Sequence, residues 1–157
     1  ENFRNTMKLK RDVRLDMAYE KAKKDIGRIS KRELFIAGFM LYWAEGTKGD
    51  LAFTNTNAAM IKVFVGWLRL MKVSVGRIKI QLQLYKDMKA DEKVNYWSQE
   101  LEIPISQFRK PYFKKTSSTR INYRGAFGQG TCTIMIHDRK LADYVAMALK
   151  YVANLHS

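Results

Sequence analysis

The sequence has very few of the residues that build thiol, histidine or zinc chemistry. In 157 residues there are two histidines and one cysteine, Cys132. A single cysteine excludes a disulfide within the chain, and no group of Cys and His residues has the spacing of a zinc site. No Ser-His-Asp or Cys-His arrangement can be argued from so few groups. The lack of disulfides indicates a reducing compartment, and we expect a cytoplasmic protein.

Acidic residues are also scarce relative to basic ones. The chain has 29 Lys and Arg against 15 Asp and Glu, which gives a formal net charge of +14. No apolar run approaches the ~18 residues of a membrane span, and no signal peptide is visible, so we expect no membrane partner. A basic excess of this size predicts an anionic partner, with nucleic acid favoured over a membrane surface. The chain begins at Glu1 rather than methionine, which suggests a fragment of a longer protein.

The most informative segment is ELFIAGFMLYWAEGTKGD, residues 33–50. Residues 34–44 are all apolar or small, which predicts a helix buried on most sides, in the core or against a second protomer. Ser30 and Glu33 have the spacing of a capping box at the start of this helix. Gly46 predicts a left-handed C-cap at its end.

Glu45 falls in the last turn of this helix, at the negative end of the helix dipole. A carboxylate there is disfavoured by a few tenths to about 1 kcal/mol, and a bound cation would compensate it. Gly38, Leu41, Tyr42 and Glu45 are spaced i, i+3, i+4 and i+7 and so share one face. If that face meets its own copy across a twofold axis, two Glu45 carboxylates converge, and a divalent metal would bridge them. The alternative is that Glu45 reaches solvent or pairs with Lys48.

The end of the helix, Leu41-Tyr42-Trp43-Ala44-Glu45-Gly46, resembles the LAGLIDADG motif, the signature helix of a family of homing endonucleases and related DNA-binding proteins. The likeness is to the single-motif subgroup of this family. It implies that the helix packs against a second copy and that Glu45 binds a divalent metal, Mg²⁺ or Mn²⁺, for phosphodiester hydrolysis. It also implies a homodimer on a pseudo-palindromic duplex DNA site. Trp43 replaces the first acid of the motif, and Lys48 and Lys79 are the candidates for a catalytic lysine.

The segment 77–86 alternates strictly between polar and apolar residues. This pattern predicts a strand with one buried and one exposed face. In the DNA major groove, Arg and Lys suit guanine and Gln suits adenine, and the exposed face carries no acid. The alternative is an ordinary solvent-exposed strand face. We predict DNA contacts from Arg77, Lys79, Gln81 and Gln83.

The stretch 108–124 contains many basic residues and no Asp or Glu. Residues 114–119 (KKTSST) predict a flexible basic loop, and residues 120–124 predict a strand with a basic face. This strand would form a hairpin with the alternating segment 131–137 across a Gly-rich turn. The further candidates for DNA contact are Arg109, Lys110, Lys114, Lys115, Arg120, Asn122 and Arg124.

The order of the expected elements defines the fold class. Residues 1–32 predict a basic helical arm or linker, which either contacts the DNA backbone or is an ordinary solvated face. Residues 33–157 predict one LAGLIDADG-like domain of the α+β class, with helices on one face of a largely antiparallel sheet. The helix expected at 90–101 is an addition to the minimal pattern of the family. The expected helices are 34–45, 58–71, 90–101 and 139–153, and the expected strands are 51–53, 77–86, 120–124 and 131–137.

Three functions are compatible with these patterns. The first, which we favour, is a metal-dependent DNA endonuclease of homing type. The second is a DNA-binding regulator that keeps the fold without cleavage, as the Trp43 substitution and the lack of an assignable catalytic lysine suggest. The third is an RNA-binding protein or splicing cofactor, because basic sheets with exposed tyrosines also suit RNA. Cleavage of DNA in the presence of Mg²⁺ separates the first function from the others.

Overall fold

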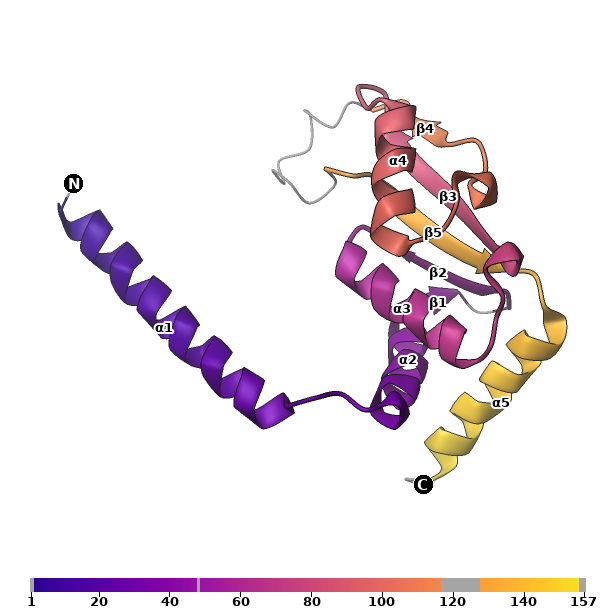
Figure 1. The fold of residues 1–157 in the computed structure, drawn as a ribbon, viewed down its shortest axis with the longest axis horizontal. Helices are drawn as coiled ribbons and strands as arrows, with labels where there is room; N and C mark the ends of the chain where they lie inside the picture. Colours follow the sequence, from indigo (N-terminus) through magenta and orange to yellow (C-terminus); the bar gives the residue numbers. More distant parts are fainter. Residues whose placement is uncertain (1, 48, 117–127, 156–157) are drawn as a thin grey trace. The chain divides into compact units, whose positions relative to one another are not determined.

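The computed structural model describes residues 2–47, 49–116 and 128–155 (Figure 1). The chain forms two compact units, Glu1–Glu33 and Leu34–Ser157. Within the described ranges the fold is α+β, as predicted, with five helices and a five-stranded mixed sheet. No helix in these ranges is long and apolar enough to span a lipid bilayer. In chain order the elements are α1 (Asn2–Ile26), α2 (Lys31–Glu45), β1 (Gly46–Thr47), β2 (Leu51–Asn55), α3 (Ala58–Leu70), η1 (Val75–Arg77), β3 (Ile78–Tyr85), α4 (Ala90–Leu101), η2 (Ile105–Gln107), β4 (Tyr112–Lys114), β5 (Thr131–Ile136) and α5 (Arg139–Asn154).

The first unit contains the long helix α1, so the N-terminal segment is helical, as predicted. Lys23 and Lys24 lie in its last turn, where the helix dipole favours cations. The helix stops at Gly27, which has a φ of 61° and donates its backbone N–H to the Lys23 carbonyl over 3.0 Å. A left-handed glycine is a common end for a helix because it has no side chain to clash with the backbone.

The predicted capping box at the start of α2 is confirmed. The backbone N–H of Ser30 donates to Glu33 Oε2 (2.6 Å), and the backbone N–H of Glu33 donates to Ser30 Oγ (3.2 Å). These two bonds satisfy donors that the helix would otherwise leave unpaired. The bond from the Ser30 backbone also lowers the pKa of Glu33, because it stabilises the carboxylate.

The sheet has the strand order β1-β2-β5-β3-β4. The pairs β1–β2, β2–β5 and β5–β3 are antiparallel, but β3 and β4 are parallel, so the expected antiparallel sheet is wrong at this edge. The inserted helix is the cause. After α4, the segment η2 brings Phe108 beside Ile80, and the N–H of Arg109 donates to the Ile80 carbonyl (2.8 Å). The chain thus returns to the beginning of β3 before it forms β4, and such a crossover joins parallel strands.

Strand β5 lies inside the sheet, between β2 and β3. Its residue Ile134 is in register with both Phe53 and Ile80. The strand that the sequence predicts at 120–124, as the hairpin partner of β5, lies outside the described residues. The predicted bounds of β2, β3, β5, α3, α4 and α5 agree with the structure to within two residues.

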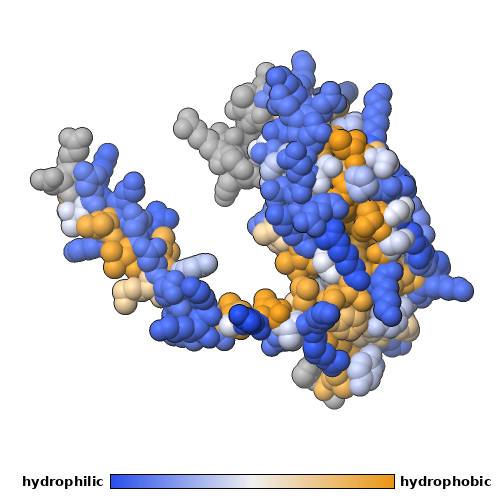
Figure 2. Space-filling model, viewed as in Figure 1, coloured by the Kyte–Doolittle hydropathy of each residue, from blue (hydrophilic) through white to orange (hydrophobic). Residues whose placement is uncertain are grey.

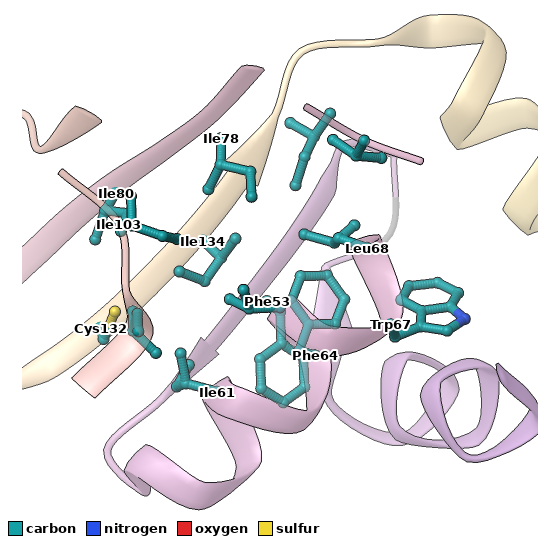
Figure 3. Packing of buried hydrophobic residues seen from close by; sticks show 14 of the residues in the cluster. Phe53, Ile61, Phe64, Trp67, Leu68, Ile78, Ile80, Ile103, Cys132 and Ile134 are labelled. Carbon is teal, nitrogen blue, oxygen red and sulfur yellow. The ribbon is translucent and has the colours of Figure 1, made fainter. Parts of the chain in front are cut away.

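The core lies between the sheet and helices α3 and α4 (Figure 3). Phe53 of β2 stacks on Phe64 of α3 with ring centroids 4.7 Å apart, and Trp97 of α4 is fully buried. Helix α3 begins at Asn57, whose side chain accepts hydrogen bonds from the backbone of Ala59 and Met60. The strand β3 contributes one complete row of fully buried side chains, Ile78, Ile80, Leu82 and Leu84.

The face of α2 that contains Gly38 and Tyr42 packs within the same protomer. A Cβ atom at Gly38 would lie 2.0 Å from Cγ of Trp67 on α3. Tyr42 stacks on Trp67 with ring centroids 6.1 Å apart, and Leu41 packs against the same core. This corrects the expectation that Gly38, Leu41 and Tyr42 meet a second copy. The indole of Trp67 needs a residue without a side chain opposite it, and Gly38 provides that space.

The other side of α2 stays exposed. Ile36, Met40 and Trp43 follow one another at helical spacing, and Trp43 is 47% exposed. The end of the helix also differs from expectation, because Gly46 has no positive φ and the chain passes directly into β1. The ring of Tyr42 explains the glycine, since a Cβ at Gly46 would lie 2.3 Å from Tyr42 Cδ2.

Replacement of Gly38 by alanine tests this packing. We expect Gly38→Ala to lower the free energy of unfolding by about 1–3 kcal/mol, because the new methyl group overlaps the Trp67 ring. Gly76→Ala is the matched control, since nothing lies within 4 Å of a Cβ at that position. Urea denaturation followed by circular dichroism measures both variants. Equal stability of the two would show that α2 does not pack on Trp67 in this way.

Candidate nucleic-acid interface

One side of the sheet faces away from the core, and we call it the open face. Because side chains alternate along a strand and residues in register share a side, the strand pairing defines its members. Lys79 pairs with Met135, for example, and Gln83 pairs with both Thr131 and Tyr112. The open face consists of Ala52, Thr54, Lys79, Gln81, Gln83, Tyr85, Tyr112, Lys114, Thr131, Thr133 and Met135.

The open face is polar without being acidic. Ala52 and Tyr85 are buried, whereas its other side chains are half-buried or exposed, and Tyr112 is 61% exposed. The hydroxyl groups of Thr54 and Thr133 lie 2.9 Å apart, which links β2 to β5 across the surface. The face therefore presents hydroxyl, amide and ammonium groups together with one tyrosine ring.

Basic side chains from three segments gather on or beside the open face. Lys79 Nζ donates to Gln107 Oε1 (3.1 Å), and Lys114 Nζ lies 5.6 Å above the centre of the Tyr85 ring. Gln81 Nε2 donates to the Lys110 carbonyl (2.6 Å), which holds the segment after η2 against β3. The parallel strand β4 is what brings Lys114 to this surface.

Arg109 connects this basic segment to β5. Its guanidinium donates to His137 Nε2 (2.8 Å), and Nη1 lies 4.0 Å from Met135 Sδ. The side chain therefore lies beside the open face, near the C-terminal end of β5. Arg109 was predicted to contact DNA because of its charge. Its hydrogen bond with His137 is visible only in the structure.

Arg77 has a different environment from the other predicted contacts. It lies at the end of η1 and forms an ion pair with Asp138. Asp138 is the N-cap of α5, and its side chain accepts from the backbone N–H of Leu141 (3.1 Å). That bond, and then the Arg77 guanidinium, lower the pKa of Asp138. Arg77 is thus held at the start of α5 by a partner within the chain.

The remaining predicted residues divide into two groups. Lys110 and Lys115 are exposed, the latter one residue beyond β4. Lys48, Arg120, Asn122 and Arg124 lie outside the described residues. The sequence also missed the open-face residues Thr54, Thr131, Thr133, Tyr112 and Met135. The alternation of residues 131–136 was visible, but the register with β3 was needed to assign these side chains to the same surface as Lys79.

Glu45 is exposed at the last position of α2, immediately before the edge strand β1. Within the described ranges, no three His, Cys, Asp or Glu side chains come together as metal ligands. One carboxylate can still be part of a Mg²⁺ site, because Mg²⁺ keeps several waters and uses one or two carboxylates together with substrate phosphates. The Glu45 carboxylate therefore fits a site that a second protomer or the substrate completes.

Apolar side chains are exposed on α2 and α5 (Figure 2). The two helices touch where the rings of Phe39 and Tyr144 meet edge to face, with centroids 6.2 Å apart. An uncovered apolar surface of this kind is typical of a protein interface. The residues concerned are Ile36, Met40 and Trp43 on α2 and Tyr144, Met147, Tyr151 and Leu155 on α5.

In comparisons with known proteins, the chain matches no family model, no curated protein and no solved structure.

The ion pair between Arg77 and Asp138 predicts a pH-dependent stability. Asp138→Asn keeps an oxygen that can cap α5 but removes the charge opposite Arg77. Because folding depresses the pKa of Asp138 below its ordinary 3.8, the charge stabilises the fold above that value. The free energy of unfolding of the wild type should therefore exceed that of Asp138→Asn by a constant amount near neutral pH. This difference should shrink as the pH falls through the pKa of Asp138 in the folded protein. Urea titrations of both proteins from neutral pH to about pH 2.5 measure it. An advantage that grew on acidification would contradict the assignment.

Proposed function

We propose that this chain binds duplex DNA through the open face, as a homodimer, and hydrolyses phosphodiester bonds with a divalent metal held by Glu45, in the manner of the LAGLIDADG homing endonucleases. The observation that carries the proposal is the open face itself. It gathers ammonium, amide and hydroxyl groups on one exposed side of a sheet, and none of its side chains is acidic.

The distribution of charge supports a single DNA-binding side. Lys79, Lys110 and Lys114 can neutralise phosphates, and the release of counterions from DNA then favours binding. The acidic residues Asp91 and Glu92 lie on α4, which packs on the opposite side of the sheet. Like charges would repel the helix side from the DNA backbone. A twisted sheet can place part of its surface in the major groove, which admits two strands of a β-ribbon.

The exposed side of α2 supports a homodimer. Ile36, Met40 and Trp43 would be covered if two α2 helices packed across a twofold axis. This arrangement uses the side of α2 opposite to Gly38, since Gly38 is occupied by Trp67. Two α2 helices that pack in parallel through this side would place two Glu45 residues at the same end of the helix pair, with each Glu45 on the Gly38 side of its own helix.

Glu45 would hold the metal through its carboxylate oxygens, which are the ligands that Mg²⁺ and Mn²⁺ prefer. A bound divalent metal supplies charge stabilisation for a phosphate and an activated water. The contribution of the chain is to position DNA. Lys79 lies on the open face, where its ammonium group can hold a phosphate oxygen. Lys48, the other candidate catalytic lysine, lies outside the described residues.

A second function has one specific observation in its favour. Trp43, at the position of the first acid of the motif, is half exposed and adds no carboxylate next to Glu45. A protein that binds DNA as a regulator without cleaving it would need none. Tyr112 on the open face gives a smaller indication for RNA, because exposed aromatic rings stack on unpaired bases.

The salt dependence of binding tests the open face. Lys79→Ala with Lys114→Ala should reduce the slope of log Kd against log salt by about two, one for each phosphate that is no longer neutralised. The matched double variant is Lys62→Ala with Lys89→Ala, whose lysines pair with Glu100 and Glu92 on the helix side. Fluorescence anisotropy with a labelled duplex measures both, with structured RNA as competitor. An equal loss in the control variant would move the interface away from the open face, and a strong preference for RNA would favour the RNA function.

The role of Glu45 is tested by cleavage. Glu45→Gln keeps the shape of the side chain but loses the charge that holds a hard cation, so it should abolish cleavage with Mg²⁺ or Mn²⁺. Duplex binding should stay within about tenfold of the wild type, a change of about 1.4 kcal/mol. Glu92→Gln, at an exposed carboxylate of α4, is the control and should cleave normally.

A randomised duplex library, sequenced after incubation with each protein, detects the cuts. A wild type that binds selected sites tightly and cuts none of them would replace the endonuclease function by the regulator function. Cleavage by Glu45→Gln at the wild-type rate would show that Glu45 has no part in metal binding.

A further inference from the structure

The side chains of the open face differ in whether partners within the chain already occupy them. Gln81 donates to the Lys110 carbonyl, Lys79 donates to Gln107, and Thr54 pairs with Thr133. The side-chain amide of Gln83 makes no hydrogen bond to another residue in the described part of the chain. Among the described residues, Gln83 is therefore the amide of this face that has no partner within the chain, so its donor and acceptor can both bind a ligand.

The position of Gln83 is fixed by its neighbours. It stands in one row across the sheet, between Thr131 of β5 and Tyr112 of β4. The row is held at its β5 end by Gly130, which has a φ of 76°. If Gly130 carried a side chain, its Cβ would lie only 2.9 Å from the Gln83 carbonyl oxygen. A residue with a side chain could not approach β3 so closely, so Gly130 sets the register of Thr131 opposite Gln83. The half-buried Gln83 side chain has a neighbour on each side.

The chemistry of this row matches one kind of base pair. A free Gln amide can donate to adenine N7 and accept from adenine N6 at the same time, and no other base offers that pair of groups in the major groove. Thr131 adds a methyl group, which suits the C5 methyl group of thymine. From the free amide of Gln83 and its neighbour Thr131, and given the proposed binding of duplex DNA, we infer that Gln83 is a specificity-determining residue that selects an A·T pair at one position of each half-site.

The polar side chains of the open face thus have different roles. Gln81 has the same side chain two residues earlier, but its amide is tied to the Lys110 carbonyl and is less free to turn toward a base. Lys79 and Lys114 carry charge, which fixes the position of DNA without reading its sequence. Selection at the Gln83 position would therefore persist when these lysines are removed, although overall binding weakens.

The experiment is selection of sites from a randomised duplex library, followed by sequencing. The wild type should enrich adenine at one position of each half-site. Gln83→Arg should enrich guanine at that same position, because a guanidinium donates to guanine O6 and N7, with a preference of about 5- to 150-fold over adenine. Gln83→Ala should lose the preference there and retain the others. Thermal unfolding of both variants confirms that they fold.

The matched control is Gln99→Arg, the same change of side chain and charge at an exposed position of α4. Its site profile should equal that of the wild type. If the wild type enriches a site and Gln83→Arg leaves every position unchanged, the role of Gln83 is overturned while DNA binding stands. If the wild type enriches no duplex at all, the proposed function fails and the assignment of Gln83 fails with it.

Discussion

The two-sided character of β3 is the constraint on which the rest of the structure depends. Its apolar residues fill the core, and burial of each is worth about 1.5–3 kcal/mol relative to exposure. A slip of one residue against β5 would place Lys79 and Gln81 in that core and expose the aliphatic row. The register Ile80–Ile134 is therefore strongly fixed. Because the core side is determined in this way, the polar residues must share the opposite side.

The position of α2 depends on a second contact, between Gly38 and Trp67. The indole lies directly on the helix, and the hydroxyl of Tyr42, one turn further on, donates to the carbonyls of Thr47 and Asp50. Burial and the negative charge of Asp50 raise the pKa of Tyr42, so this hydroxyl remains a donor. These bonds tie the end of α2 to the turn between β1 and β2. Glu45 is consequently anchored at the edge of the sheet by the packing of Gly38 and Tyr42 on its own helix.

Local patterns were sufficient to predict the elements that carry their own signals. The capping box at Ser30 and the alternation of β3 are properties of neighbouring residues, and the structure confirms both of them. The strand β4 has no such signal, because it is only three residues long and exists through its pairing with β3. The face of α2 was assigned wrongly for a related reason. Glycine at position 38 indicates a close contact, but only the fold shows that the contact is Trp67.

At the open face, too, the sequence pattern did not reveal contacts between distant segments of the chain. The sequence identified Lys79, Gln81 and Gln83 as one set, since all three lie on the same side of one strand. It could not distinguish them, because the difference lies in Gln107 and Lys110, which reach the sheet through η2.

The difference in hydrogen bonding between Gln81 and Gln83 has a physical consequence for recognition. In the free protein, water can satisfy the amide of Gln83, so leaving it unpaired costs little. In a complex with the wrong base pair, the same amide would be removed from water without a partner, at a cost of about 1–3 kcal/mol. Discrimination therefore requires an amide that is free before binding and enclosed after it. Gln83 meets the first condition, and its half-buried position between Thr131 and Tyr112 favours the second.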